Sequence, residues 1–482
     1  MSTLSLPAQV PSQAIPSTKK SVAKLTLWPL VAATFFMVSG GTYGTEAIIA
    51  GAGYGRGILV LLFLPVLWCL PTAFMIGELS SALPAEGGYY AWVRRGLGDF
   101  WGFQEAWLSL GASIFDMAIY PTLFTIYLKQ MVPWFGEGHL EVFGGVLTLS
   151  HGLLAALFVV GTCVALNLAG IRVVGLTSVW LFFLLSLPFA LIVLLSPIRA
   201  GVFADPHTAS TGASVTLLGA VLVAMWNYMG WDNASTIAQE VERPRKTYPR
   251  AMIAAVILVS VSYVLPFLAV YWTGIPPSAF NEEGSWATIA GKLGGSLGGF
   301  QWLGFMVTLG GMMSAFGMFN ALVLSYSRLP LAMARDGMLP PVFARVTKKN
   351  ETPWVSIIVC AICWLPCLVL GFQRLVTLDI LLYGAALMLE FVTLVALRIR
   401  EPKLYRGFRV PGGMAGAVTC GMFPFALLIL AMVESDHEAI FGLNALVFGI
   451  LIILAGFAAY FGSSKVREKY VPQGSHQASE LA

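Results

Sequence analysis

The sequence predicts an all-α membrane protein with twelve transmembrane helices, and two observations support this prediction. Hydrophobic residues make up 57% of the 482 residues and charged residues only 11%, whereas an ordinary soluble domain has about 25% charged residues. Apolar stretches of about 20 residues, the length at which a helix crosses the hydrocarbon core of a bilayer, recur along the chain. A chain so poor in charge cannot cover a soluble surface.

The expected spans follow one another with short connections and leave no stretch for a soluble domain. In order they are 26–50, 57–83, 100–131, 149–169, 173–196, 214–241, 251–273, 300–326, 353–370, 375–397, 414–433 and 439–461. We therefore expect a single membrane domain at residues 25–461. Polar tails lie on either side of it, at 1–24 and 462–482, and we expect the first of them to be disordered.

The distribution of basic residues predicts the orientation in the membrane. If both termini are cytoplasmic, all but five of the 28 Lys and Arg residues lie on the cytoplasmic side, as the positive-inside rule requires. The five on the outer side are Arg56, Lys129, Arg199, Lys292 and Arg374. The net charge of +4 is therefore a topology signal, and we expect a plasma or inner membrane protein with no nucleic-acid partner.

Eight acidic residues fall inside the expected spans, whereas Lys129, near the outer end of span 100–131, is the single Lys or Arg within their bounds. They are Glu46, Glu78, Glu105, Asp116, Asp232, Glu240, Asp379 and Glu390. The four glutamates other than Glu46 lie near span ends, where we expect them to reach water or a loop arginine. Asp379 lies near the outer end of span ten, where we expect it to be solvated. Glu46, Asp116 and Asp232 lie in mid-span or beside interior breaks, where a charge is costly and usually marks a transport pathway.

Two of the spans contain residues that interrupt a helix. The first carries "SGGTYGTE" at 39–46 and the sixth carries "WNYMGWDN" at 226–233. A broken helix at membrane depth is tolerated only where the freed backbone lines a cavity. Each break lies in the first helix of a set of five, spans one to five and spans six to ten. Because five is an odd number, the second set enters the membrane inverted relative to the first. Repeats at about 25–196 and 214–397, followed by two extra helices at 414–461, are the pattern of a secondary transporter. In the alternative interpretation, the two glycine-rich stretches only allow neighbouring helices to pack closely.

Other chemistry is not indicated by the sequence. We find no phosphate-binding loop and no converging Ser, His and Asp residues, so we expect neither an enzyme nor a bound cofactor. The six cysteines lie in apolar surroundings, where packing is a better interpretation than a metal site. A channel is disfavoured because the acids gather at the breaks and form no ring along one pore.

Several segments resemble a known family. "WNYMGWDNASTIAQEVERPRKTYPRAM" (226–252) and "SRLPLAMARDGMLPPVFARV" (327–346) resemble the amino acid–polyamine–organocation superfamily. Within it, "EGGYYAWVRRGLGDFWGFQEAW" (86–107), "IFDMAIYPTLF" (114–124), "LEFVTLVALRIREPK" (389–403) and "RGFRVPGG" (406–413) resemble the polyamine uptake transporters of plants and their bacterial relatives. The resemblance spans about 28–461. It implies a LeuT-type fold with a 5+5 inverted repeat, broken helices 1 and 6, and proton-linked uptake.

The resemblance also implies a set of substrate-binding residues. On the first helix they are Ser39, Gly40, Gly41, Thr42, Tyr43, Gly44, Thr45 and Glu46; on the third, Ala112, Ser113 and Asp116; on the sixth, Trp226, Met229, Gly230 and Asp232. Trp226 matches an aromatic residue that closes over substrate in the family, and core packing is its alternative role. The family's loop motifs further predict that Arg243, Arg245, Arg328 and Arg335 hold a cytoplasmic gate, with Glu240, Glu242 or Asp336 as partners.

Glu46 predicts the charge of the substrate. In amino-acid members, the freed amides at this break bind the substrate carboxylate, as a helix N-terminus should. Here the last glycine of that pattern aligns with Glu46, which would repel a carboxylate and attract an ammonium group. With Asp116 and Asp232 at other depths, we expect a cationic amine such as a polyamine. As the alternative, Glu46 points away and caps the half-helix that follows the break.

The coupling ion is less well defined. Span five has no lysine, whereas some proton-coupled relatives carry one there. We therefore expect the proton to bind a buried carboxylate, Asp232 or Glu46; sodium bound by Ser314 and first-helix carbonyls is the alternative.

Two alternative functions remain: an amino-acid permease or exchanger for neutral or cationic amino acids, and a transporter-derived nutrient sensor. The oligomeric state is not predicted.

Overall fold

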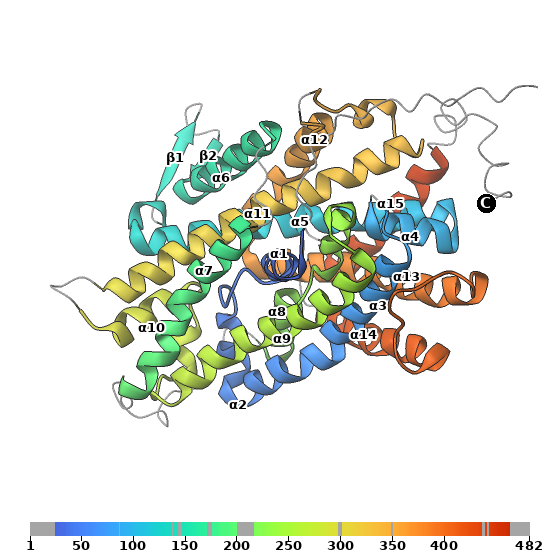
Figure 1. Cartoon of the computed structure of the whole chain (residues 1–482). Coiled ribbons are helices and arrows are strands. Elements are labelled where there is room, and N and C mark those ends of the chain that lie inside the picture. The colour runs from blue at the N-terminus through green and yellow to red at the C-terminus, as the bar shows by residue number, and fades with distance from the viewer. Residues whose placement is uncertain are drawn as a thin grey trace, which may run out of the picture.

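The computed structural model describes residues 25–85, 87–136, 138–142, 147–170, 176–199, 216–296, 301–348, 350–435, 439–440 and 443–462. The expected tail at 1–24 lies outside these residues, as does the expected tail at 462–482 except for its first residue, Gly462. The described chain is built of helices (Figure 1). Two antiparallel hairpins connect some of them: β1 (His139–Val142) pairs with β2 (Leu147–Ser150), and β3 (Ala439–Ile440) pairs with β4 (Leu443–Asn444).

The helices alternate between long apolar segments and short connecting ones. The first half contains α1 (Leu27–Val38), α2 (Glu46–Leu64), α3 (Leu70–Ala82), α4 (Gly88–Leu97), α5 (Asp99–Met131), α6 (His151–Leu168) and α7 (Leu176–Leu195). The second half contains α8 (Leu217–Asn227), α9 (Pro244–Tyr271), α10 (Ser285–Gly294), α11 (Trp302–Arg335), α12 (Trp354–Trp364), α13 (Phe372–Arg400), α14 (Gly413–Ser435) and α15 (Ala445–Gly462). Short turns of π or 3-10 helix are η1 (Pro65–Cys69), η2 (Pro133–Phe135), η3 (Ser196–Arg199), η4 (Trp231–Glu240), η5 (Pro277–Phe280), η6 (Pro341–Ala344) and η7 (Leu365–Val369).

The helices identify an integral multi-pass membrane protein. Within the described residues, nine helical segments are long and apolar enough to cross a bilayer, and the helices Leu27–Val38 and Trp354–Val369 are shorter but also apolar. Large apolar side chains such as Phe158 and Trp180 are exposed on the outside, which suits a surface that faces lipid rather than water. The nine segments are fewer than twelve because the first, sixth and ninth expected spans are broken or short. The count of twelve and the inverted repeat stay predictions.

The long segment Glu46–Ala82 contains a turn that the helix bounds hide. Gly53 has φ 70°, a left-handed conformation that glycine adopts without steric cost. The turn separates a short helical piece after the first break from the long second span. This division falls where the sequence predicts the first span to end and the second to begin.

The first half-helix occupies the interior of the bundle. α1 packs against α7, α9 and α11, and η4 lies beside it (Figure 1). Leu25, just before α1, pairs with Val241, just after η4, so α1 begins where η4 ends. The two half-helices are therefore antiparallel, and the interrupted stretches that follow α1 and precede η4 meet in the middle of the molecule.

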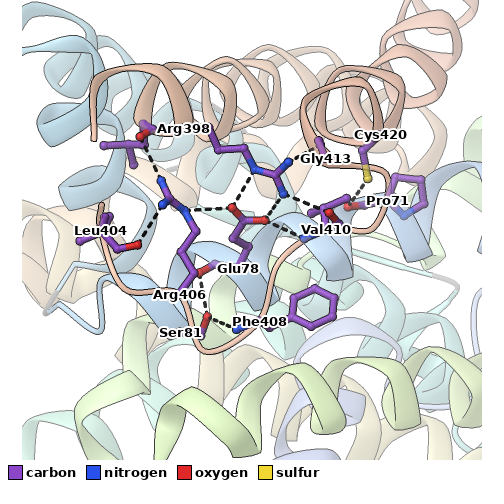
Figure 2. Close-up of polar contacts among 12 residues, drawn as sticks. Pro71, Glu78, Ser81, Arg398, Leu404, Arg406, Phe408, Val410, Gly413 and Cys420 are labelled. Carbon is purple, nitrogen blue, oxygen red and sulfur yellow. Dashed lines mark hydrogen bonds and ion pairs between the residues drawn. The ribbon is translucent and has the colours of Figure 1, made fainter. Parts of the chain in front are cut away.

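A buried ion-pair network fastens the connection between α13 and α14 to α3 (Figure 2). Glu78 is fully buried. Its carboxylate accepts two hydrogen bonds from Arg398, of 2.9 and 2.5 Å, and lies 3.1 Å from Nε of Arg406. The backbone amide of Val410 donates to the same carboxylate at 2.7 Å. The expectation that Glu78 reaches a loop arginine is confirmed.

Candidate functional site

The first helix is interrupted where its sequence predicts. α1 ends at Val38 and α2 begins at Glu46. Between them Gly40, Gly41 and Gly44 have φ of 59°, 108° and 78°, a region in which side chains with a Cβ are strained. Glycine is thus required for the chain to leave the helix and re-enter it within seven residues.

The sixth expected span is interrupted as well. α8 ends at Asn227, Gly230 has φ 84°, and the chain resumes as the 3-10 helix η4 at Trp231. The two breaks touch each other. The side-chain amide of Asn227 donates to the carbonyl of Gly44 at 3.3 Å, and a Cβ on Gly230 would lie 3.1 Å from the carbonyl oxygen of Met37.

Neighbouring helices satisfy the backbone groups that the breaks release. Ser314 on α11 donates to the carbonyl of Gly40 at 2.6 Å, and Tyr263 on α9 donates to the carbonyl of Asn227 at 2.8 Å. The amide of Gly230 donates to the hydroxyl of Tyr383 at 3.2 Å. Unsatisfied backbone groups cost several kcal/mol at membrane depth, so these bonds are what allow two broken helices in the interior.

A small cavity of about 20 Å³ lies at the junction of the breaks, α5, α11 and α13. Its lining residues are Met37, Val38, Asp116, Tyr120, Trp226, Met229, Gly230, Asn233, Tyr326, Asp379 and Tyr383. This volume holds little more than one water molecule, so the site is closed in this structure and would have to widen to admit an organic substrate. Among the residues that the structure describes, two carboxylic acids and no basic residue line it, so the polarity of its wall suits a cation.

Asp116 is held by two tyrosines. Its Oδ1 accepts a hydrogen bond of 2.9 Å from Tyr120, which lies one turn further along α5. Its Oδ2 accepts a bond of 3.0 Å from Tyr326 on α11. Both oxygens are therefore oriented from two helices, while the carboxylate still lines the cavity.

Asp379 is the main correction to the sequence interpretation. It was expected to be solvated at an outer span end, but it is 2% exposed and lines the cavity. The reason is that α13 begins at Phe372, so Asp379 lies two turns inside the helix. Tyr383, one turn further, donates a hydrogen bond of 2.7 Å to Asp232. Asp232 is not a lining residue, but this tyrosine joins it to the cavity wall.

Glu46 lies apart from the cavity. It is buried at the first residue of α2 and accepts a hydrogen bond of 2.9 Å from Tyr127. Its other neighbours are Glu283 and the backbone of Gly284, in the segment that leads into α10. Glu46 therefore lies at the first residue of the half-helix that follows the break, outside the lining of the cavity.

The remaining expected residues divide into two groups. Trp226, Met229 and Gly230 line the cavity together with Asp116. The residues Ser39, Gly40, Gly41, Thr42, Tyr43, Gly44 and Thr45 form the first break without lining the cavity, and neither Ala112 nor Ser113 lines it. The indole of Trp226 lies 6.3 Å from the ring of Tyr120 and 5.5 Å from that of Phe372, so it both faces the cavity and packs in the core.

Several lining residues were missed by sequence reasoning. They are Met37, Val38, Tyr120, Asn233, Tyr326 and Tyr383. A usable signal exists for two of them, because Tyr120 and Tyr383 each lie four residues after an acid in a span, on the same face of the helix. Met37 and Val38 precede the glycines of the break and look like ordinary apolar residues of a helix.

Two more glutamates depart from expectation. Glu105 on α5 and Glu390 on α13 were expected to reach water or a loop arginine, but they are 0% and 1% exposed. Ser109 donates to Glu105 at 2.7 Å. One oxygen of each glutamate, Oε2, has no hydrogen-bond partner among the described residues.

The expected gate residues are partly paired as predicted. Arg243 lies 3.6 Å from Glu242, and Arg328 donates to the carbonyl of Thr236 at 3.3 Å. Asp336 forms an ion pair of 2.6 Å with Arg94 of α4, a residue the sequence did not single out for this role. The side chain of Glu240 lies outside the described residues.

Comparison with known proteins gives a consistent result. The sequence profile of the amino acid permease family matches residues 31–466. The chain is 33% identical over 453 residues to the polyamine transporter RMV1 of Arabidopsis thaliana, covering 92% of this chain and 87% of that one. It is 35% identical over 446 residues to the polyamine transporter PUT1 of Oryza sativa subsp. japonica, covering 91% and 78%. It is 26% identical over 455 residues to the serine/threonine exchanger SteT of Bacillus subtilis (strain 168), covering 93% and 97%.

Proposed function

Because this chain belongs to the amino acid permease family, we propose that it is a secondary active transporter that takes up a cationic amine, such as a polyamine, together with protons. The substrate enters the cavity between the two broken helices from one side of the membrane. The helices then rearrange so that the cavity opens to the other side, as in alternating access.

The acidic wall of the cavity is the observation that supports this proposal. Asp116 and Asp379 line the same small space, Asp232 is joined to it through Tyr383, and no Lys or Arg of the described chain lines it. A buried carboxylate is costly without a positive partner. An ammonium group in the cavity supplies that partner, and a substrate with two ammonium groups supplies it to two carboxylates at once. A neutral zwitterion would bring a carboxylate into the same space and be repelled.

The aromatic part of the wall suits the rest of such a substrate. Tyr120, Trp226 and Tyr326 line the cavity beside Asp116. Aromatic rings attract ammonium groups through their faces and pack against methylene chains, so an alkyl diamine makes favourable contacts along its whole length. The names of the two plant relatives, both polyamine transporters, support the same class of substrate.

Within this proposal, Asp116 and Asp379 take the amine-selecting role that the sequence suggested for Glu46. Glu46 faces Tyr127 and the segment before α10 and does not line the cavity. Asp232, which shares Tyr383 with the cavity wall, is kept as a proton carrier. A proton on Asp232 removes one negative charge next to the bound amine and so links proton binding to substrate binding.

Ligand binding to the purified protein tests the substrate class. A ligand that binds only the folded state raises the unfolding temperature, so we expect putrescine and spermidine to raise it and serine to leave it unchanged. The variant Asp379→Asn should lose the response, whereas Glu351→Gln, at an exposed loop position, should keep it. Stabilisation by serine with none by either polyamine would overturn the proposal.

An amino-acid exchanger is the second candidate. The observation that favours it is the relation to the serine/threonine exchanger SteT over 93% of this chain. The unfolding temperature separates the two candidates. For an exchanger, serine or threonine would raise it, and Asp379→Asn would have no specific effect on that response.

A further inference from the structure

A second pair of buried acids, which the proposed substrate site does not use, lies between α5 and α13. Glu105 and Glu390 are both buried, and Glu105 is among the charges that act on Glu390. Tyr89 of α4 lies within electrostatic reach of both, and Asp232 does so as well. Asp232 also interacts with Asp116 and Asp379 at the cavity. Asp232 is therefore within electrostatic reach of both pairs of acids.

The spacing along the two helices shows how these pairs are built. Glu105 and Asp116 lie eleven residues apart on α5, and Asp379 and Glu390 lie eleven residues apart on α13. Eleven residues are three helical turns, so each helix presents both of its acids on one face, about 16 Å apart along its axis. α5 packs against α13. Asp116 acts electrostatically on Asp379, and Glu105 acts on Glu390. This pairing fits two antiparallel helices that carry one pair of acids at each of two levels.

The pair of Glu105 and Glu390 has no positive partner within the described residues. Oε2 of Glu105 and Oε2 of Glu390 are buried without a hydrogen-bond partner among the described residues. The titratable groups that face the pair are Tyr89 from α4, Asp232 from η4 and Tyr383 from α13. No Lys or Arg of the described chain is among the charges that act on it. The arginines Arg94, Arg95 and Arg398 pair instead with Asp99, Glu401 and Glu78.

Two adjacent carboxylates in a dry site that lacks a cation share a proton, because like charges that close cannot both be ionised. A metal ion is the other way to neutralise them. However, no group of three or more His, Cys, Asp or Glu side chains within the described residues is placed to hold one. The free oxygens of the pair are therefore suited to a proton.

We infer that Glu105 and Glu390 form a proton-binding site that exchanges protons with the substrate cavity through Asp232. This inference rests on the proposed transport function and assigns the coupling step to a site away from the substrate. In each transfer a carboxylic acid gives its proton to a neighbouring carboxylate, so one O–H bond breaks as another forms and no further reactant is needed. A proton that enters from the cavity passes from Asp232 to the pair and leaves at the end of the bundle covered by α4.

Transport by the purified chain in proteoliposomes tests this site. Glu105→Gln and Glu390→Gln mimic the protonated acid, and Glu351→Gln serves as the matched surface control. We expect accumulation of labelled putrescine driven by a pH gradient, and the proton entry reported by an internal dye, to fall by about tenfold or more in both variants. Counterflow of putrescine at equal pH on both sides, which needs no net proton movement, should stay within about twofold of the wild type. Wild-type accumulation and proton entry in both variants would overturn the inference.

Two further arms keep the outcomes separate. If the wild type shows no putrescine counterflow, the proposed function fails. The pair is then tested by infrared spectroscopy, in which either Gln variant should lose a protonated carboxyl band.

If either Gln variant also loses counterflow, the variant Ser109→Ala tests the inference, because it keeps both acids and removes only the hydrogen bond to Glu105. It should shift the pH dependence of accumulation, and an unchanged profile would contradict us. Putrescine accumulation that is driven by a sodium gradient and is lost in the two Gln variants would also contradict the inference.

Discussion

At the scale of single residues, the cavity and the first break assign different roles to two buried acids. Asp116 lines the cavity and is oriented by Tyr120 and Tyr326, whereas Glu46 is bonded to Tyr127 away from it. The sequence could place both acids at interruptions or in mid-span. It could not tell which carboxylate faces the cavity, because that depends on the direction in which the chain leaves Gly44.

Replacing each acid by its amide separates these roles. Asp116→Asn should weaken polyamine binding by about 3–5 kcal/mol, because an ammonium group would lose a buried partner. Glu46→Gln should cost about 1 kcal/mol or less and affect all ligands alike, as expected for a residue at a helix N-terminus. Calorimetric titration of both variants with spermidine measures the difference. Equal losses in the two variants would show that Glu46 also contacts the amine.

Glu78 provides a residue-scale prediction on stability. It is the shared partner of Arg398 and Arg406, and burial lowers the pKa of Arg406 while Glu78 raises it again. Glu78→Gln leaves two buried guanidinium groups without their carboxylate, which should cost about 3–5 kcal/mol of stability. Thermal unfolding in detergent should show a lower midpoint than for Glu351→Gln. A midpoint equal to that of the wild type would mean that the loop is held by its apolar contacts alone.

At the scale of elements, the breaks depend on glycine. A Cβ on Gly40 would lie 2.2 Å from Sδ of Met318 and 2.5 Å from Oγ of Ser314, and φ there is +59°. Gly40→Ala should therefore destabilise the protein by about 1–3 kcal/mol and impair transport. Gly55→Ala is the control, since a Cβ there meets nothing within 4 Å and alanine favours helix. We would measure unfolding midpoints and uptake of both variants; an unaffected Gly40→Ala variant would argue against a rigid break.

The helix α4 is tied to its surroundings by arginines outside the membrane spans. A hydrogen bond from Arg95 holds the pKa of Glu401 below its usual value of 4.5. A lowered pKa in the folded state means that the contact stabilises the protein above pH 4.5 and that this contribution is lost as the pH falls through the lowered value. Because both side chains are partly exposed, we expect less than about 1 kcal/mol. The difference in unfolding midpoint between wild type and Glu401→Gln should vanish in acid; a difference that persists there would point to packing instead.

The sequence predicts elements best where the residue types are extreme. The long apolar spans and the Gly- and Asx-rich breaks were found because lipid and left-handed backbone leave few other choices. The helices α4 and α10, at Gly88–Leu97 and Ser285–Gly294, were not predicted, since ten residues with mixed polarity look like a loop. The burial of Asp379, Glu105 and Glu390 was missed for a related reason: helix ends on this protein are covered by other elements, and a single span does not report its neighbours.

At the scale of the whole molecule, the proposed acidic pathway depends on the two broken helices together with α5 and α13. The breaks supply space and backbone flexibility, while α5 and α13 contribute Asp116, Asp379, Glu105 and Glu390 on their facing sides. Composition and resemblance could predict the membrane fold and the family. The pathway itself needed the packing of helices that are far apart in the sequence, because Asp116 and Asp379 are separated by more than half of the chain.

Counterflow in liposomes tests the central claim, that this chain is a carrier selective for cationic amines, most directly. Liposomes containing the purified protein are loaded with unlabelled putrescine and diluted into a trace of labelled putrescine. A carrier exchanges one for the other, so we predict a transient accumulation of label inside, which spermidine competes with and serine does not. A channel or a sensor would give no accumulation. Counterflow with serine but none with putrescine or spermidine would contradict the account and identify an amino-acid exchanger instead.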